Sequence, residues 1–89
     1  MTPDIRVRIK YLSAVRDVAG RREEEAAFPP GATLRDVAAM IDERYGLIVP
    51  SARVMAVLMG RGWDQLDQGL ATELHDGDVI ALFPPVDGG

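Results

Sequence analysis

The stretch Ile5-Arg6-Val7-Arg8-Ile9-Lys10-Tyr11 alternates strictly between apolar and basic side chains. A period of two residues is typical of a strand that buries one face and exposes the other. The stretch therefore predicts a strand over residues 5–11 whose apolar face lies against a core, and the other elements are placed around it.

The residues that follow predict a short helix and a second strand. Residues 13–20 suit one or two helical turns that end at Gly20, a residue type that often terminates helices. A strand is predicted over 22–28. Its run Glu23-Glu24-Glu25 is typical of a solvated sheet edge, where charge discourages pairing with other chains.

The main helix is predicted to begin after Thr33, because Asp36 stands three residues later in an approximate capping box. Gly46 is a natural residue to end it. The helix should bury one stripe of side chains, which recur at helical spacing. This stripe is Leu34, Val37, Ala38, Ile41 and Tyr45.

The second half of the chain predicts two further strands around an irregular piece. Residues 53–59 are apolar on both faces, as expected of a central strand covered by the helix on one side and by loops or a partner on the other. A short strand around 63–65 and then a loop are expected next. The pair Asp76-Gly77 predicts a turn before a buried strand over Val79–Phe83, which Pro84 ends because proline cannot donate to a sheet.

These elements define an α+β fold, with one main helix packed on a mixed sheet of four to five strands. The 89 residues correspond to roughly 0.6 of a typical domain, which predicts a single domain over residues 1–89. Residues 84–89 are expected to project from it as a C-terminal tail.

Composition narrows the classes of partner and location. Fourteen acidic residues against ten basic ones give a formal net charge of −4, which argues against nucleic-acid binding by phosphate neutralisation. No apolar run approaches the ~20 residues that span a bilayer, and the N-terminus lacks a signal-peptide pattern. We therefore expect a cytoplasmic protein with neither a nucleic-acid nor a membrane partner.

Few side chains could perform catalysis. The chain has no cysteine and a single histidine, His75, and a lone histidine beside a turn is most often solvated. Asp76 and Asp78 suit turn formation better than calcium binding, because no further oxygen ligands follow at loop spacing. No metal site and no bound cofactor are expected. Any sulfur chemistry would need sulfur from another molecule.

The C-terminal segment Phe83-Pro84-Pro85-Val86-Asp87-Gly88-Gly89 offers a different kind of chemistry. Two prolines stiffen the exit from the last strand, so that the six residues from Pro84 to Gly89 could reach roughly 19 Å. Glycines without a Cβ can thread a narrow channel in a partner enzyme. The reactive group would then be the terminal carboxylate, although a frayed polar tail is the alternative explanation.

A terminal carboxylate becomes reactive when ATP converts it into an acyl-adenylate. A sulfur nucleophile can then displace AMP and leave a thiocarboxylate. This mechanism needs no Cys, His or metal in the carrier itself, and so it fits the few catalytic candidates.

Motifs over nearly the whole chain resemble those of the ubiquitin-like β-grasp sulfur carriers, and within them the small subunit of molybdopterin synthase. The most specific are the Gly-Asp before the last strand and the ending Pro-Pro-Val-x-Gly-Gly. Residues 11–20, which include Arg16, and the helix entry over 30–34 are also similar. One region departs: Leu58 stands where relatives often have Asn, and the pattern over 59–65 does not match.

The resemblance implies a fold, a reactive residue and partners. A separate activating enzyme would use ATP and Mg to adenylate Gly89, with Gly88 beside it, and a sulfurtransferase system would supply sulfur. The thiocarboxylate would enter the large subunit of molybdopterin synthase, in a heterotetramer, to build the dithiolene of molybdopterin. The chain alone would be non-catalytic.

A docking surface is expected around the start of the tail, at Phe83, Pro84, Pro85 and Val86, with Leu58 or Met59 beside it. Interface cores favour aromatic residues and Met, and strand alternation should expose one of Leu82 and Phe83. A core position for Phe83 is the alternative.

Two other functions remain open at this point. One is a related carrier that feeds tungsten-cofactor, thiamine or cysteine biosynthesis. The other is a ubiquitin-like modifier joined to lysines, or an interaction module with an inert tail.

Overall fold

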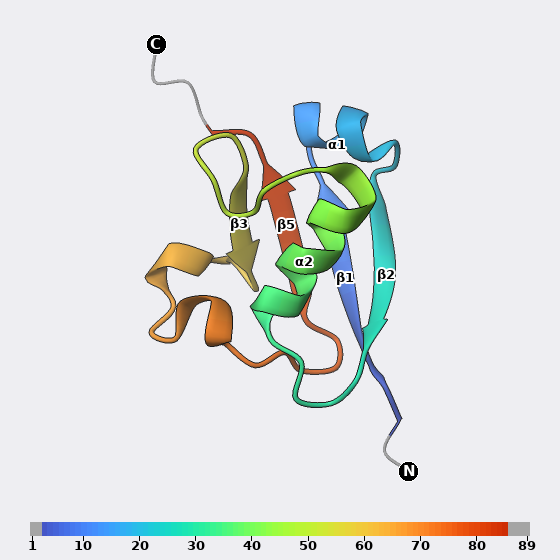
Figure 1. Cartoon of the computed structure of the whole chain (residues 1–89), viewed down its shortest axis with the longest axis vertical. Coiled ribbons are helices and arrows are strands. Elements are labelled where there is room, and N and C mark those ends of the chain that lie inside the picture. Colours follow the sequence, from blue (N-terminus) through green and yellow to red (C-terminus); the bar gives the residue numbers. More distant parts are fainter. Residues whose placement is uncertain (1–2, 86–89) are drawn as a thin grey trace.

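The computed structural model describes residues 3–85, which form a five-stranded mixed sheet with one main helix (Figure 1). The expected β-grasp architecture is thereby confirmed, while Val86, Gly88 and Gly89 lie outside the described residues. In chain order the elements are β1 Ile5–Tyr11, α1 Ala14–Ala19, β2 Glu23–Phe28, α2 Leu34–Tyr45, β3 Met55–Leu58, β4 Arg61–Gly62, the 3-10 helices η1 Trp63–Gln65 and η2 Gly69–Ala71, and β5 Val79–Phe83.

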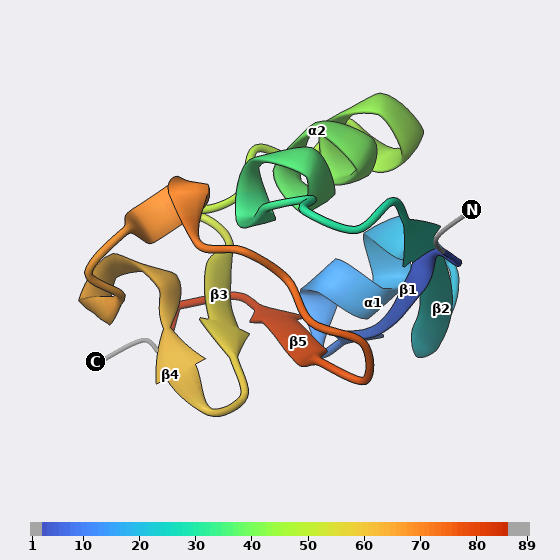
Figure 2. The same cartoon turned by 90° about the horizontal axis from the view of Figure 1, so that it is seen from below.

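The sheet order is β2-β1-β5-β3-β4. The central strands β1 and β5 are parallel, with Ile9 opposite Ile80, and the other neighbours are antiparallel. Figure 2 shows α2 across one face of the sheet, whereas the described part of the chain places no helix over the other face. We call this second face the outer face.

The core forms between α2 and the inner face of the sheet. Val7, Ile9 and Tyr11 on β1 are fully buried, as are Ile80 and Leu82 on β5. Leu34, Val37 and Ile41 on α2 are fully buried against them. The period-two strand and the helical stripe therefore meet as the sequence predicts.

The ends of α2 are fixed by local hydrogen bonds. The Thr33 N–H donates to Asp36 Oδ2 at 2.8 Å, which satisfies one of the free donors at the helix start. Gly46 ends the helix with a φ of 67°, a left-handed conformation that glycine adopts without steric cost. Among the described residues, no helix has both the length and the apolar character needed to cross a membrane.

The expected strand over 53–59 is shorter in the structure and ends in a tight hairpin. Leu58 lies opposite Arg61, so only Met59 and Gly60 form the turn, with φ of 50° and 85°. Positive φ at both central residues matches the twist of a two-residue hairpin. This turn accounts for the shortening of β3.

The expected strand around 63–65 is wrong. Pairing stops at Gly62, and residues 63–65 form the 3-10 helix η1. Trp63 is only 2% exposed and belongs to the core. Burial of this large side chain draws the backbone out of the sheet, and a short irregular segment carries no periodic pattern that would reveal it.

Candidate functional site

The last strand delivers the chain to the predicted tail. Leu82 is fully buried towards α2 and Phe83 is half-buried on the outer face. The expectation that one of these two residues is accessible is confirmed, and it is Phe83. Pro84 is half-buried and Pro85 is exposed.

Phe83, Pro84 and Pro85 line a surface hollow of about 520 Å³ together with Leu12 and Ser13. We call these five residues the tail root. The two chain segments are held together because the Leu12 N–H donates to the Leu82 carbonyl at 3.0 Å. Leu12 is 47% exposed, so the tail root presents an accessible apolar side chain beside the exit of the tail.

Leu12 and Ser13 also belong to this surface, and neither is predicted there from the sequence. Leu12 follows the alternation of Arg6, Arg8 and Lys10, whose side chains face solvent. An apolar side chain at a position that should face solvent is the sequence feature that could have indicated this surface. Ser13 has a φ of 54°, and its carbonyl accepts from the Arg16 N–H at 3.0 Å. This backbone turns the chain from β1 into α1 and keeps Leu12 and Ser13 beside Pro84 and Pro85.

The outer face is apolar over β3 and β5. Met55 pairs with Phe83 and Val57 pairs with Ala81, so these four side chains lie together on the face that no described helix covers. Met55 is 39% exposed. This apolar strip adjoins the tail root and extends the accessible surface beside it.

The predicted contribution of Leu58 to docking is wrong. Leu58 is 8% exposed, because strand alternation turns it with Ala56 towards α2. Met59 is 62% exposed, but its N–H donates to the Val79 carbonyl at the start of β5. It therefore lies at the opposite end of β5 from Phe83.

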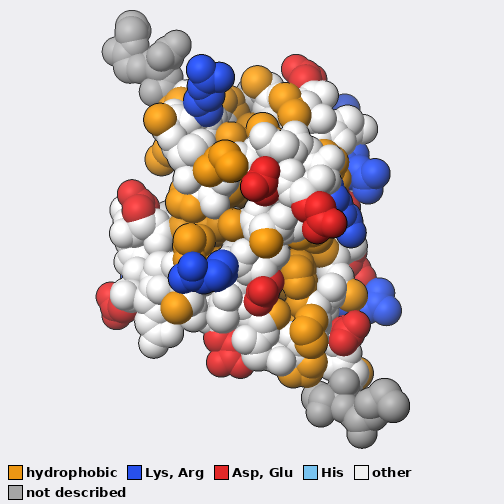
Figure 3. Space-filling model, in the orientation of Figure 1, with side chains coloured by type: hydrophobic (Ala, Val, Ile, Leu, Met, Phe, Trp, Pro, Cys, Tyr) orange, Lys and Arg blue, Asp and Glu red, His pale blue; other side chains and the backbone are white. Residues whose placement is uncertain are grey.

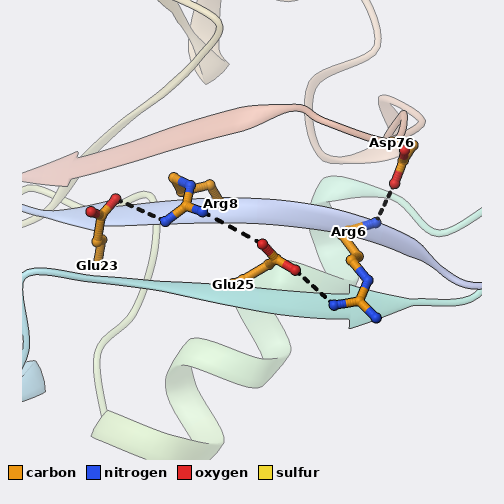
Figure 4. A network of polar contacts seen from close by, with 5 residues as sticks. All are labelled: Arg6, Arg8, Glu23, Glu25 and Asp76. Atoms are coloured by element: carbon orange, nitrogen blue, oxygen red, sulfur yellow. Dashed lines mark hydrogen bonds and ion pairs between the residues drawn. The ribbon is translucent and has the colours of Figure 1, made fainter.

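The outer face over β1 and β2 carries a ladder of ion pairs (Figure 4). Arg6 pairs with Glu25 at 2.9 Å, and Arg8 pairs with Glu23 at 3.2 Å and with Glu25 at 3.5 Å. The Arg6 N–H also donates to Asp76 Oδ1 at 2.8 Å. These exposed pairs neutralise one another, and exposed pairs contribute little to stability.

Glu24 differs from its neighbours in the acidic run, because it is buried rather than solvated. Period two turns it to the core side, opposite Ile9. Its carboxylate accepts from the Tyr11 hydroxyl at 2.9 Å, from Arg44 Nη1 at 2.6 Å and from the Tyr45 hydroxyl. The expected solvated edge is therefore wrong at this residue.

These contacts fix the protonation of the buried cluster. Burial alone would raise the pKa of Glu24, but hydrogen bonds from Tyr45 and Tyr11 and the charges of Arg21 and Arg44 lower it overall. Burial and the Glu24 carboxylate raise the pKa of Tyr11. The cluster ties β1 and β2 to α2, and its role is structural.

The predicted turn before β5 is present. The Asp78 N–H donates to the His75 carbonyl at 3.0 Å, and the His75 N–H donates to Asp78 Oδ2 at 2.8 Å. The His75 side chain is 77% exposed. Across residues 3–85, no group of three or more His, Asp or Glu side chains is placed to hold a metal ion.

The fold and its exit strand define a ubiquitin-like β-grasp domain. The sequence matches the ThiS family over residues 9–89, and the chain belongs to that family. The match extends over the whole tail, including the terminal glycines.

Two relatives show the range of roles within this family of ubiquitin-like sulfur carriers and modifiers. Small archaeal modifier protein 3 of Haloferax volcanii is 31% identical over an alignment of 91 positions, and the alignment covers 91% of this chain and 96% of that protein. The molybdopterin synthase sulfur carrier subunit of Escherichia coli is 29% identical over 85 residues, covering 93% of this chain and 99% of that protein.

A solved complex shows a relative with its partner. The complex of subunits 1 and 2 of the molybdopterin-converting factor from Helicobacter pylori contains a chain that is 28% identical, with a TM-score of 0.63. The alignment covers 96% of this chain and 100% of that chain. Relatives of this protein therefore assemble with a partner subunit.

Proposed function

We propose that this protein is the sulfur carrier of a molybdopterin synthase, and that Gly89 is its reactive residue. The observation that carries the proposal is the family match through Gly89, joined to a last strand that releases the tail from an accessible surface. The carrier role of the Escherichia coli relative supports the choice of pathway.

The chemistry takes place at the terminal carboxyl group. A carboxylate oxygen attacks the α-phosphorus of ATP, pyrophosphate leaves, and an acyl-adenylate forms on a separate activating enzyme with Mg. Hydrosulfide from the sulfur donor then attacks the acyl carbon, AMP leaves and the sulfur loses its proton, which gives the Gly89 thiocarboxylate. ATP and Mg belong to the activating enzyme, and the carrier supplies the acyl group.

The body of the protein positions this group for its partners. Pro84 cannot donate a backbone hydrogen bond, so it ends the sheet beside Leu12 and Ser13. Leu12 and Phe83 give the large synthase subunit an apolar surface at the base of the tail. Docking at this surface would keep the tail aligned with the partner's channel while the end of the tail enters it.

A second function, protein modification, is favoured by the similarity to the archaeal modifier. Both functions begin with the same acyl-adenylate. They differ in the nucleophile that displaces AMP, which is sulfur in a carrier and a lysine amine in a modifier.

The test is a reconstituted synthase that contains the chain, the activating enzyme, Mg-ATP, a sulfur donor and the large subunit. We expect formation of the dithiolene product, and Leu12→Gln should lower its rate about tenfold at subsaturating carrier, because loss of a central apolar contact weakens docking. Melting temperature should change little, since Leu12 is 47% exposed.

Ile48→Gln is the matched control. Ile48 is 61% exposed and lines a hollow with Arg35 and Asp42 of α2, and this hollow shares no residue with that of the tail root. The control variant should retain the wild-type rate. Equal rates for both variants would contradict docking at the tail root, and lysine conjugates without product would favour the modifier function.

A further inference from the structure

Basic side chains are distributed unevenly on this acidic chain. Arg6, Arg8, Arg21 and Arg44 all form ion pairs with the Glu23–Glu25 run. On the side that carries α2, charges of both signs are interspersed with apolar side chains (Figure 3). Three other cations lie close together and form no ion pair with any residue that the structure describes.

Lys10, Arg16 and Arg22 line a single hollow of about 290 Å³ with Tyr11, Leu12 and Glu23. We call these three cations the basic collar. Within residues 3–85 none of the three forms an ion pair, and all are exposed. Glu23 is the one acidic residue that lines the hollow among the described residues, and it already pairs with Arg8 at 3.2 Å.

Three segments bring the collar together at one end of the sheet. Lys10 is near the end of β1, and the Tyr11 N–H donates to the Arg22 carbonyl at 2.7 Å. Arg16 lies in α1, which follows β1 directly. Tyr11 lies opposite Leu82 on β5, so the collar is at the end of the sheet from which the tail leaves.

The collar adjoins the tail root. Leu12 lines both hollows, the apolar one with Phe83 and the basic one with Lys10. Any protein that covers Leu12 therefore approaches the collar within the ~10 Å over which charges interact at ordinary ionic strength. A net charge of −4 would otherwise repel an acidic partner.

We propose that the basic collar docks on a carboxylate-rich protein surface beside the channel that receives the tail. This inference rests on the proposed function, because it requires a partner that takes the tail. Opposite charges at the rim of an interface accelerate association and orient the partners. The collar would direct the tail to its channel before the apolar contacts form.

The test compares two double variants that each remove two positive charges. Lys10→Gln with Arg22→Gln neutralises most of the collar. Arg35→Gln with Arg61→Gln makes the same charge change at exposed residues on α2 and β4. Association with the activating enzyme and with the large subunit is measured by stopped flow in low and high NaCl, and melting temperature reports folding.

With at least one of the two partners, the collar variant should associate about tenfold more slowly than wild type in low salt, and the difference should vanish in high salt, where charges are screened. The control should match wild type. With saturating activating enzyme, both variants should reach the wild-type yield of thiocarboxylate.

Three results would overturn the inference. The collar variant could associate like the control with both partners at both salt concentrations. Its defect could persist in high salt, which would indicate a non-electrostatic contact. The isolated wild-type chain could bind ATP while the collar variant does not, which would assign the cations to a phosphate ligand.

A wild-type chain that gives no thiocarboxylate would instead refute the proposed function, and the inference with it.

Discussion

A chain that ends at Asp87, without Gly88 and Gly89, is expected to fold normally and to transfer no sulfur. Terminal residues beyond the last strand bury little surface, so the melting temperature should stay within about 1 °C of wild type. The shortened tail would end two residues short of the adenylation centre and would present a bulkier terminus to the channel. Sulfur delivery in the reconstituted synthase measures the loss.

Asp87→Ala in the full-length chain is the control for this truncation. It alters the adjacent residue but keeps the tail length and both glycines, and it should retain most of the activity. A large fall in the melting temperature of the truncated chain would mean that the tail packs on the body. Sulfur delivery by the truncated chain would refute the role of the terminal glycines.

Glu24→Ala is expected to cause the largest loss of stability. It removes the acceptor of the Tyr11 and Tyr45 hydroxyls and of Arg44, and Tyr11 is fully buried. Buried donors without partners are costly, so the free energy of unfolding should fall by about 3 kcal/mol, which corresponds to roughly 12 to 24 °C in melting temperature. Thermal and urea unfolding at pH 7 measure it.

Glu25→Ala on the same strand provides the comparison. Glu25 pairs with Arg6 and Arg8, but its side chain is 41% exposed, so its loss should cost less than about 1 kcal/mol. Similar losses for the two variants would show that Glu24 is no more important than a surface residue.

The Glu24 cluster should also make stability depend on pH. The folded pKa of Glu24 lies below its ordinary value of 4.5. Its carboxylate therefore stabilises the fold above that value, and the benefit is lost as the pH falls through the folded pKa. The stability gap between wild type and Glu24→Gln should be largest near neutral pH and narrow in acid.

Periodic patterns were enough to predict most of the fold. The alternation over Ile5–Tyr11, the helical stripe of α2 and the turn before β5 all describe elements that bury one regular face. Such patterns reflect the local geometry of a strand or a helix. The order of the predicted strands and helices then indicates the fold class, even though the pairing of the strands is not known.

The remaining features depend on pairing across the sheet or on individual packing. Trp63 enters the core from a 3-10 helix, which has no repeating pattern. The sequence does not show which face of the sheet Leu58 occupies, because its strand is apolar on both sides. Its pairing with Ile80 on β5 determines that its side chain faces α2. Glu24 is buried because Tyr11, Tyr45 and Arg44 from other elements converge on it.

The candidate site likewise contains some residues that the sequence predicts and others that it does not. The sequence predicts Phe83, Pro84 and Pro85 as docking residues because they lie at the end of the last strand and just after it, and the structure places all three along one surface hollow. The sequence did not identify Leu12, whose position beside the tail arises from the parallel pairing of β1 and β5 between segments that are distant in sequence. The terminal glycines lie outside the described residues, and their role stays a prediction.

Intact-mass spectrometry of the full-length protein tests the sulfur-carrier proposal most directly. The chain is incubated with the activating enzyme, Mg-ATP and a sulfur donor, and fragmentation locates any change. We expect one oxygen of the Gly89 carboxyl group to be replaced by sulfur. A chain that keeps its carboxylate under conditions that convert a known carrier would contradict the proposal.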